Sequence, residues 1–233
     1  MIPLLGDAYE FPAVSRALAE PDGLLAVGGD LSSGRLLAGY QRGIFPWFSP
    51  GDPILWWAPS QRMVLQPDKL RVTRSLAKSL RNKPYTFCFD RDFEAVMRAC
   101  AAPRVGQSGT WITEDMIAAY CALHAAGHAH SAEVWQQGRL VGGLYGVAVG
   151  RMFYGESMFH RVTDASKIAV VRLAEVLFGN GFGMIDCQLF TPHLESLGAQ
   201  LIPRAEFVAR LETYIRLPAP ASLWATEFCN EPS

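Results

Sequence analysis

Residues 131–159, SAEVWQQGRLVGGLYGVAVGRMFYGESMF, contain three apolar stretches separated by two tight turns. SAEVWQQ, RLVGGLYGVAV and RMFYGESMF carry the β-branched and aromatic residues that strands favour. The turns between them fall on QGR and VGR, where Gly138 and Gly150 permit a sharp reversal of the chain. The stretch therefore predicts three consecutive strands, and the rest of the chain can be placed around them.

Helices and further strands are expected on both sides of this stretch. Thr73 is placed to cap a helix that ends before Pro84, and the helix expected over 164–181 is apolar nearly all round, which predicts deep burial. Thr191 with Pro192 begins a short helix that ends at Gly198, and the tail from Pro218 is expected to be irregular. The other expected elements are strands at 85–89, 183–190 and 199–203, and helices at 92–101, 113–127 and about 205–215.

The first 60 residues differ from the rest in their richness in Gly, Pro and Trp. They contain one legible helix, which Asp30 or Ser32 can cap and Gly43 can end. We therefore expect a small N-terminal domain over residues 1–61 and a larger domain over 62–233.

The element order from Tyr85 is β-α-α-β-β-β-α-β-α-β, which resembles the GNAT acyltransferase fold. The expected fold class is thus α+β, with the small N-terminal domain followed by a GNAT-like domain around a mixed, mainly antiparallel sheet. A fold does not fix a function. Acyl-CoA enzymes of this fold hold the pyrophosphate on a glycine-rich loop at a helix N-terminus. The loop here, FHRVTDASK at 159–167, contains no glycine, which disfavours acetyl-CoA as the donor.

Composition limits the classes of protein to consider. The 233 residues are 50% hydrophobic and 18% charged with a net charge of −1, so any nucleic-acid binding needs locally clustered basic residues. Five cysteines without a CxxC pair favour a reducing compartment over a disulfide framework or a zinc knuckle. The N-terminus has no signal-peptide pattern and no apolar run reaches 18 residues. We expect a cytoplasmic protein without a membrane partner.

One segment, KLRVTRSLAKSLRNKP at 69–84, carries six basic residues and no acid. On the expected helix Arg74, Lys78 and Arg81 share one face, and Lys83 follows them. The segment is either a phosphate-binding surface or an ordinary solvated face, and the sequence leaves both open.

Several aromatic residues and histidines admit two interpretations. Trp47 and Trp111 lie among Gly, Pro and Thr, where a ring can be held as a stacking platform for a base or can simply join the core. His124, His128 and His130 lie close in the sequence, but no cysteine or carboxylate is spaced to complete a zinc set. We expect hydrogen-bonded structural histidines there.

The stretch GMIDCQLF at 183–190 places an acid, a thiol and an amide in an apparently buried strand. Because strand side chains alternate, Asp186 and Gln188 are expected on one face, and Ile185, Cys187 and Leu189 on the core face. A thiol in apolar surroundings stays protonated and inert. Asp186 and Gln188 are either site residues or groups that pin a loop, and both interpretations remain open. Glu156, on another expected strand, is a candidate for the same cleft.

Specific words of the sequence carry a family resemblance. The motifs that carry it are GLLAVGGDLS, GIFPWFSPGDPILWW, GTWIT, HAHSAEVW, LVGGLYG, GESMF, IDCQ and HLESLGA. Together they resemble the leucyl/phenylalanyl-tRNA–protein transferases, and the resemblance extends from about Phe11 to Phe207. That resemblance implies a GNAT-like fold with a small N-terminal domain. It implies transfer of leucine or phenylalanine from aminoacyl-tRNA to proteins with N-terminal Arg or Lys, which are then degraded by the N-degron route. It also implies that no cofactor and no metal is needed.

The resemblance also implies roles for particular residues. IDCQ implies that Asp186 and Gln188 are the reactive pair, with Asp186 polarising Gln188, and GESM implies that Glu156 belongs to the acceptor site. Trp47 and Trp111 match the tryptophans that contact the terminal adenosine. Segment 74–83, with Arg74, Lys78, Arg81 and Lys83, matches the region that holds the acceptor stem, and Leu144, Phe153 and Ile185 match positions lining the pocket for the donor side chain. His160 departs from the family pattern, in which serine is expected.

These expectations converge on an aminoacyltransferase that acts as a monomer. The partners are Leu- or Phe-tRNA, weakly Met-tRNA, and the α-amino group of an acceptor protein. Asp186, Gln188 or the ribose 2′-OH could receive the proton of the amine. The rival functions are an acyl-CoA-dependent N-acyltransferase and a non-catalytic RNA-binding module.

Overall fold

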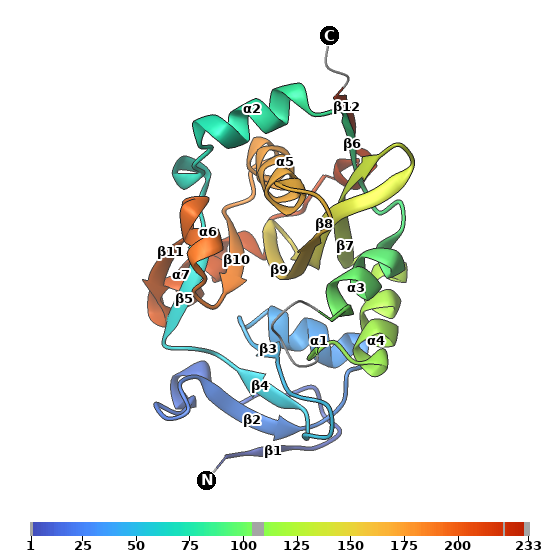
Figure 1. The fold of residues 1–233 in the computed structure, drawn as a ribbon. Helices are drawn as coiled ribbons and strands as arrows, with labels where there is room; N and C mark the ends of the chain where they lie inside the picture. Colours follow the sequence, from blue (N-terminus) through green and yellow to red (C-terminus); the bar gives the residue numbers. More distant parts are fainter. Residues whose placement is uncertain (1, 104–109, 221, 231–233) are drawn as a thin grey trace.

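The computed structural model describes residues 2–103, 110–220 and 222–230, which form a small sheet and a large sheet (Figure 1). The small sheet comes from the first 57 residues and has the order β1-β2-β4-β3. Its strands are β1 (Leu4–Leu5), β2 (Leu24–Gly28), β3 (Phe45–Pro46) and β4 (Leu55–Trp57). One helix of this part, α1 (Ser33–Tyr40), begins at the expected cap, where the Ser32 side chain accepts a hydrogen bond from the Arg35 N–H.

The large sheet has eight strands in the order β11-β5-β10-β9-β8-β7-β6-β12. The three strands expected from residues 131–159 form its centre as antiparallel neighbours, and β9 and β10 make its one parallel pair among the described residues. The α+β class and the mixed, mainly antiparallel sheet are therefore confirmed. The strands are β5 (Gln61–Leu65), β6 (Tyr85–Phe89), β7 (Ala129–Gln136), β8 (Arg139–Val149), β9 (Met152–His160), β10 (Met184–Gln188), β11 (Gln200–Pro203) and β12 (Glu227–Asn230).

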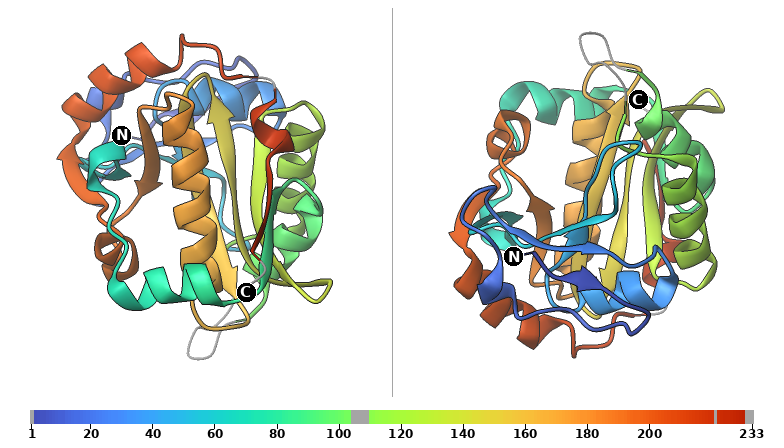
Figure 2. Two further views of the ribbon diagram at one scale, coloured as in Figure 1. Left: turned by 90° about the horizontal axis from the view of Figure 1, so that it is seen from above. Right: turned by 90° about the horizontal axis from the view of Figure 1, so that it is seen from below.

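Helices cover both faces of the large sheet, as the two views of Figure 2 show. On one face α5 (Ala165–Gly179) packs with α2 (Arg74–Asn82) in one apolar cluster, and its near-continuous burial matches the apolar pattern of the sequence. On the other face α1, α3 (Phe93–Ala101), α4 (Glu114–Ala125) and α7 (Arg204–Tyr214) share a second cluster with the small sheet. The short α6 (Pro192–Ser196) follows β10. Short 3-10 turns lie at Val14–Arg16, Pro67–Lys69 and Leu223–Ala225.

The expected order of elements from Tyr85 to β11 is confirmed, but two strands of the large sheet and the four strands of the small sheet were missed. Residues 61–65 form β5, which lies between β10 and β11 although its sequence begins with Gln61 and Arg62. The tail, expected to be irregular, contains β12, which pairs antiparallel with β6 at the edge of the sheet. Short strands of three to five residues give little periodicity, so whether such a segment forms a strand depends on its partner strand rather than on the local pattern.

The division of the chain at residue 61 stays a prediction. Phe11, Leu36 and Trp56 from the first part share one apolar cluster with Tyr154 and Phe207 from the second. Within the part of the chain that the structure describes, no helix is long and apolar enough to cross a membrane.

Candidate active site

A β-bulge in β9 changes the direction of Glu156. Tyr145 of β8 pairs with Ser157 and Gly146 pairs with Gly155, which leaves Glu156 as the extra residue. A Cβ atom at Gly146 would lie 2.2 Å from the backbone oxygen of Tyr154, so the bulge requires glycine at this position. The bulge therefore turns the Glu156 side chain out of the regular alternation of its strand.

A second bulge lies in the neighbouring strand. The pairing of β10 with β5 shifts between Asp186 and Gln188, so that Cys187 is the extra residue, and Gln188 has a φ of 55°. The parallel pairing of β9 with β10 ends at Asp186, opposite Tyr154. Beyond this point the two strands are no longer paired through their backbones, and a side-chain contact between Gln188 and Glu156 joins them instead.

Asp186 is fully buried and paired with an arginine from β5. Arg62 Nε donates to Asp186 Oδ1 at 2.8 Å and an Nη atom donates to Oδ2 at 2.6 Å. The Gln188 backbone N–H donates to the same Oδ1 at 2.9 Å. Arg62 also donates to the Gly43 carbonyl at 3.0 Å and lies over the rings of Phe45 and Phe207. The carboxylate thus accepts three hydrogen bonds, which compensate for its burial.

The side chain of Gln188 contacts Glu156 rather than Asp186. Gln188 Nε2 donates to Glu156 Oε1 at 3.0 Å, and the Tyr120 hydroxyl donates to Oε2 at 3.1 Å. Tyr120 in turn shares a hydrogen bond with the Tyr40 hydroxyl, and Tyr154 donates to the Tyr40 carbonyl at 2.6 Å. Residues from α1, α4, β9 and β10 therefore meet in one network at the point where β9 and β10 separate.

Burial raises the pKa of Glu156 to about 7, and the nearby charge of Asp186 acts in the same direction. Hydrogen bonds from Tyr40 and Tyr120 and the charge of Arg62 oppose this rise. The Glu156 residue keeps some exposure, whereas Asp186 has none. The Glu156 carboxyl therefore titrates near neutral pH.

Glu156→Gln should unfold at a higher temperature than the parent protein at pH 8.5, and the difference should be much smaller at pH 5. The folded-state pKa of Glu156 is about 7, above the ordinary value of 4.5. Its stabilising contribution is therefore present below pH 4.5 and lost as the pH rises through 7, whereas glutamine never ionises. We expect the free energy of unfolding of the variant to exceed that of the parent by about 1–3 kcal/mol at pH 8.5, given a pKa shift of this size in a partly exposed residue. Thermal melts at both pH values check this, with the exposed Glu10→Gln as the control. An equal difference at both pH values would contradict the assignment.

Residues 64–212 match the family model described as leucyl/phenylalanyl-tRNA protein transferase, and residues 29–60 match the N-terminal domain of the same family. This chain belongs to that family. A relative from Chromobacterium violaceum, named leucyl/phenylalanyl-tRNA–protein transferase, is 58% identical over 233 residues and all of both chains. A relative of the same name from Thiobacillus denitrificans is 61% identical over 94% of this chain and 96% of its own. The resemblance inferred from the sequence is therefore confirmed.

Two solved structures show weaker likeness. The L-PGS of Bacillus licheniformis has a TM-score of 0.38 and 10% identity, over 74% of this chain and 57% of its own. A GCN5-related N-acetyltransferase-like protein from Streptococcus suis has a TM-score of 0.33 and 13% identity, over 70% of this chain and 61% of its own.

Three residues that the transferase family implies for the donor pocket lie together on the opposite face of the sheet from Tyr120. Leu144, Phe153 and Ile185 come from β8, β9 and β10, and all three belong to the apolar cluster that α5 covers. Phe153 and Ile185 are register partners across the parallel pair. Their relative exposures of 4%, 0% and 4% describe closely packed side chains. Their role in a donor pocket stays a prediction.

The tryptophans are divided between surface and core. Trp47 is 42% exposed, and its ring lies 5.7 Å from that of Trp57, whose indole N–H donates to the Trp47 carbonyl. Trp56 is fully buried and donates to the Gly28 carbonyl. Trp111 is partly buried against the second apolar cluster. Trp47 thus presents an exposed ring of the kind that a base can stack on.

Helix α2 presents three of the four predicted tRNA-binding residues to solvent. Arg74, Lys78 and Arg81 are exposed, whereas Leu76 on the other face is buried. Among the described residues, the side chains of these three cations make no ion pair and no hydrogen bond. Lys83 differs, because its ammonium group donates to the Thr163 carbonyl at 2.7 Å and pairs with Asp164 at 3.5 Å.

Two expectations for the end of β10 have different outcomes. Burial raises the pKa of the Cys187 thiol far above its ordinary value, so the thiol stays protonated as expected. Leu189 was expected on the core face, but it is 40% exposed, so this prediction was wrong. The strand ends at Gln188, whose positive φ breaks the alternation on which the prediction depended.

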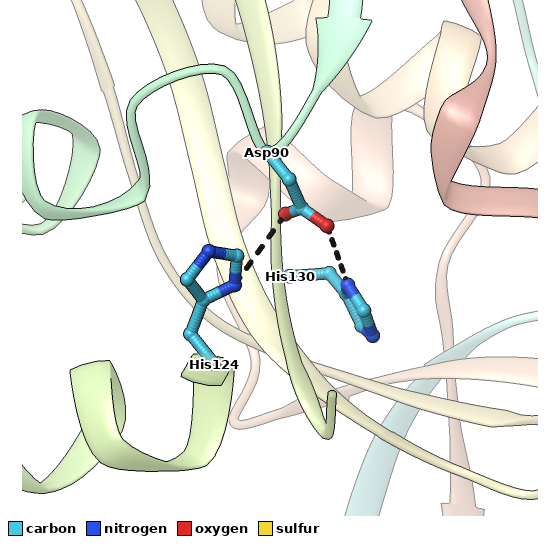
Figure 3. A group of neighbouring side chains, drawn as sticks. All are labelled: Asp90, His124 and His130. Carbon is cyan, nitrogen blue, oxygen red and sulfur yellow. Dashed lines mark hydrogen bonds and ion pairs between the residues drawn. The ribbon is translucent and has the colours of Figure 1, made fainter. Parts of the chain in front are cut away.

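The sequence showed no carboxylate spaced to join the histidines of segment 124–130, but the fold brings one to them: His124 and His130 lie on either side of Asp90 (Figure 3). His130 Nδ1 is 2.6 Å from Asp90 Oδ2, and its ring stacks on Trp224. His124 Nδ1 is 2.9 Å from the Ala129 carbonyl, and its ring stacks on Phe93. Both histidines are therefore hydrogen bonded within the fold, as expected. His160 is exposed. Burial lowers the pKa of His193, and the charges of Lys167 and His160 act in the same direction.

The sequence reasoning missed Arg62, Tyr40 and Tyr120. The ring of Tyr40 is buried in the apolar core, whereas its hydroxyl takes part in the hydrogen-bonded network. Arg62 begins an otherwise apolar run, RMVL, and a charged residue in such a run is the signal that a buried partner of opposite charge exists.

Proposed function

We propose that this chain transfers leucine or phenylalanine, and weakly methionine, from aminoacyl-tRNA to the α-amino group of proteins that begin with Arg or Lys. The family membership of the chain supports the reaction class. The observation that carries the proposal is the buried network of Arg62, Asp186, Gln188 and Glu156 at the point where β9 and β10 separate. The proposed setting is the cytoplasm, where a monomer acts without cofactor or metal and marks its products for N-degron degradation.

The reaction needs positioning more than activation. The donor is an ester, and the acceptor is an α-amine whose pKa of about 7.7–8.0 leaves it mostly protonated at pH 7. Because an ionised carboxylate only accepts hydrogen bonds, Gln188 must turn its amide nitrogen to Glu156, which directs its carbonyl oxygen away from Glu156. We assign that oxygen to hold the amine of the acceptor. Asp186, which binds the Gln188 backbone, is a positioning residue in this scheme.

The remaining predicted residues supply selectivity. Glu156 is the proposed partner for the cationic side chain of an N-terminal Arg or Lys. Leu144, Phe153 and Ile185 are proposed to line the donor pocket, which would open from the packed cluster to admit an apolar side chain. Trp47 and Trp111 are proposed to contact the terminal adenosine. An apolar pocket discriminates by only about 1–3 kcal/mol per methylene, which accounts for weak use of methionine.

One assay tests the proposed function against its rivals. The protein is incubated with tRNA carrying labelled leucine and with peptides that begin with Arg, Lys or Ala. We expect label in the Arg and Lys peptides, little in the Ala peptide, and none after treatment with RNase. Acetyl transfer from acetyl-CoA would instead indicate the acyl-CoA enzyme, and tRNA binding without transfer would indicate an RNA-binding module.

The triple variant Arg74→Ala, Lys78→Ala and Arg81→Ala should bind aminoacyl-tRNA about tenfold more weakly at physiological salt. Each lost phosphate contact removes one released counterion, so the slope of log affinity against log salt should fall by about 2–3. Filter-binding titrations at several salt concentrations measure both quantities. The matched control is Arg16→Ala, Arg139→Ala and Arg216→Ala, which removes three exposed cations elsewhere. Equal losses for both triple variants would show that only total charge matters.

A further inference from the structure

The geometry excludes Asp186 from contact with the acceptor amine. Its side chain has no exposed surface, and its oxygens accept hydrogen bonds from Arg62 Nε, from an Arg62 Nη atom and from the Gln188 N–H. A group that receives a proton from a substrate must come within hydrogen-bond reach of it. Asp186 could do so only if the ion pair opened, which would leave a buried charge without its partner.

Glu156 has the exposure and the contacts that Asp186 lacks. Its Oε1 accepts from the Gln188 side chain, and Gln188 is the residue proposed to hold the amine. Its Oε2 accepts from Tyr120, whose own hydroxyl is held by Tyr40. The carboxylate is therefore fixed next to the proposed amine site by one donor from β10 and one from α4, and Tyr40 of α1 holds the second donor in place.

We propose that Glu156 is the proton acceptor of the transfer reaction and that Tyr120 and Tyr40 are the positioning residues that hold its carboxylate in place. This inference rests on the proposed function. The ammonium group of the acceptor gives one proton to Glu156, and the neutral nitrogen attacks the ester carbonyl to form the C–N bond. The C–O bond to the ribose then breaks, and the leaving oxygen takes a second proton from the nitrogen. Glu156 releases its proton to solvent before the next cycle.

The titratable and charged groups around Glu156 fit this role. Tyr40 from α1, Tyr120 from α4, Asp186 from β10 and Arg62 from β5 all act on its carboxyl, and burial outweighs the groups that lower its pKa. The resulting pKa of about 7 lies close to that of an α-amine, which allows the proton to pass in either direction. Tyr145 from β8 also lies nearby, with its ring 5.6 Å from that of Tyr120, but its buried hydroxyl has no hydrogen-bond partner.

The pH profile of kcat/KM for an acceptor peptide beginning with Arg tests the proposal. If Glu156 must be ionised and the amine protonated, the parent profile is a bell that falls below about pH 7 and above about pH 8. Glu156→Gln should instead give a single rise that ends in a plateau, because only the neutral amine then reacts. Its activity should be about 10²-fold lower than the parent at pH 7 and less than about tenfold lower at pH 9.

Two tyrosine variants separate proton transfer from structural damage. Tyr120→Phe removes a hydrogen bond that lowers the pKa of Glu156, so the acidic limb of the bell should move to higher pH. Tyr145→Phe removes a hydroxyl from the same region that makes no hydrogen bond, so the acidic limb of its pH profile should stay where it is in the parent. A merely structural role for Tyr120 would lower the rate without moving the limb.

The outcomes distinguish the inference from the function on which it rests. Absence of transfer by the parent protein would overturn the proposed function. Transfer by the parent with a profile that rises to a plateau, or a Glu156→Gln profile that remains a bell, would overturn the assignment of Glu156 alone. A changed ratio of Arg to Ala acceptors in Glu156→Gln reports on cation selection, which is measured separately from the profile.

Discussion

Arg62→Met should lower the free energy of unfolding by about 3–5 kcal/mol. This is the largest loss that we expect from replacing any one charged side chain that the structure describes. Arg62 is 2% exposed and donates two hydrogen bonds to Asp186, which has no exposed surface. Removal of the arginine leaves a carboxylate in the interior without its counter-charge. The methionine fills similar volume between Phe45 and Phe207, so the loss reports on charge rather than on a cavity.

Denaturant unfolding of three variants, each compared with the parent protein, checks this expectation. The double variant Arg62→Met with Asp186→Leu removes both charges and should recover most of the stability, because an apolar pair replaces a buried ion pair at little cost. Arg98→Met is the matched control, because its partners Glu94 and Glu114 are mostly exposed. We expect a change below about 1 kcal/mol for the control. A loss as small as this for Arg62→Met would mean that water or a neighbouring group already solvates Asp186.

The sequence predicted the fold where local signals were strong. The turns at Gly138 and Gly150, the Thr73 cap and the apolar helix over 164–181 each depend on residues within one segment. Strand β5 could not be predicted in this way, because its five residues are ordered by β10 and β11, which lie more than 110 positions later in the chain. The pairing of β12 with β6 has the same cause.

The candidate site shows the same limit more sharply. Alternation correctly separated Asp186 from the core neighbour Ile185, but it could not foresee the bulges that turn Glu156 and Gln188 toward each other. The partner of Asp186 lies 124 residues away, on a strand that no local pattern revealed. The expectation that Asp186 polarises the Gln188 side chain is therefore replaced by a proposal in which Asp186 holds the Gln188 backbone and Glu156 holds its amide.

Asp186→Asn should slow transfer by about 10²-fold while it leaves the affinity for aminoacyl-tRNA within about threefold. An asparagine offers one acceptor oxygen where the carboxylate accepts three hydrogen bonds, and its amide group faces the donors of Arg62. Gln188 then loses its fixed position, and a misplacement of about 1 Å can cost 10²-fold in rate. The exposed cations of α2 are unaffected, so tRNA binding should persist. Single-turnover transfer and filter binding, both under conditions where circular dichroism shows a folded protein, measure the two quantities.

The double variant Arg62→Met with Asp186→Asn identifies how Asp186 acts. Without the arginine, the introduced asparagine can turn its oxygen to the Gln188 N–H, which restores the hydrogen bond but not the charge. If Asp186 acts only by position, transfer should recover at least tenfold relative to Asp186→Asn. If stability returns while transfer stays about 10²-fold low, the negative charge itself acts on the reaction, and the charge must then be transmitted through Gln188. Loss of tRNA binding in Asp186→Asn would contradict both schemes, because the ion pair would then support the whole binding surface rather than the position of one glutamine.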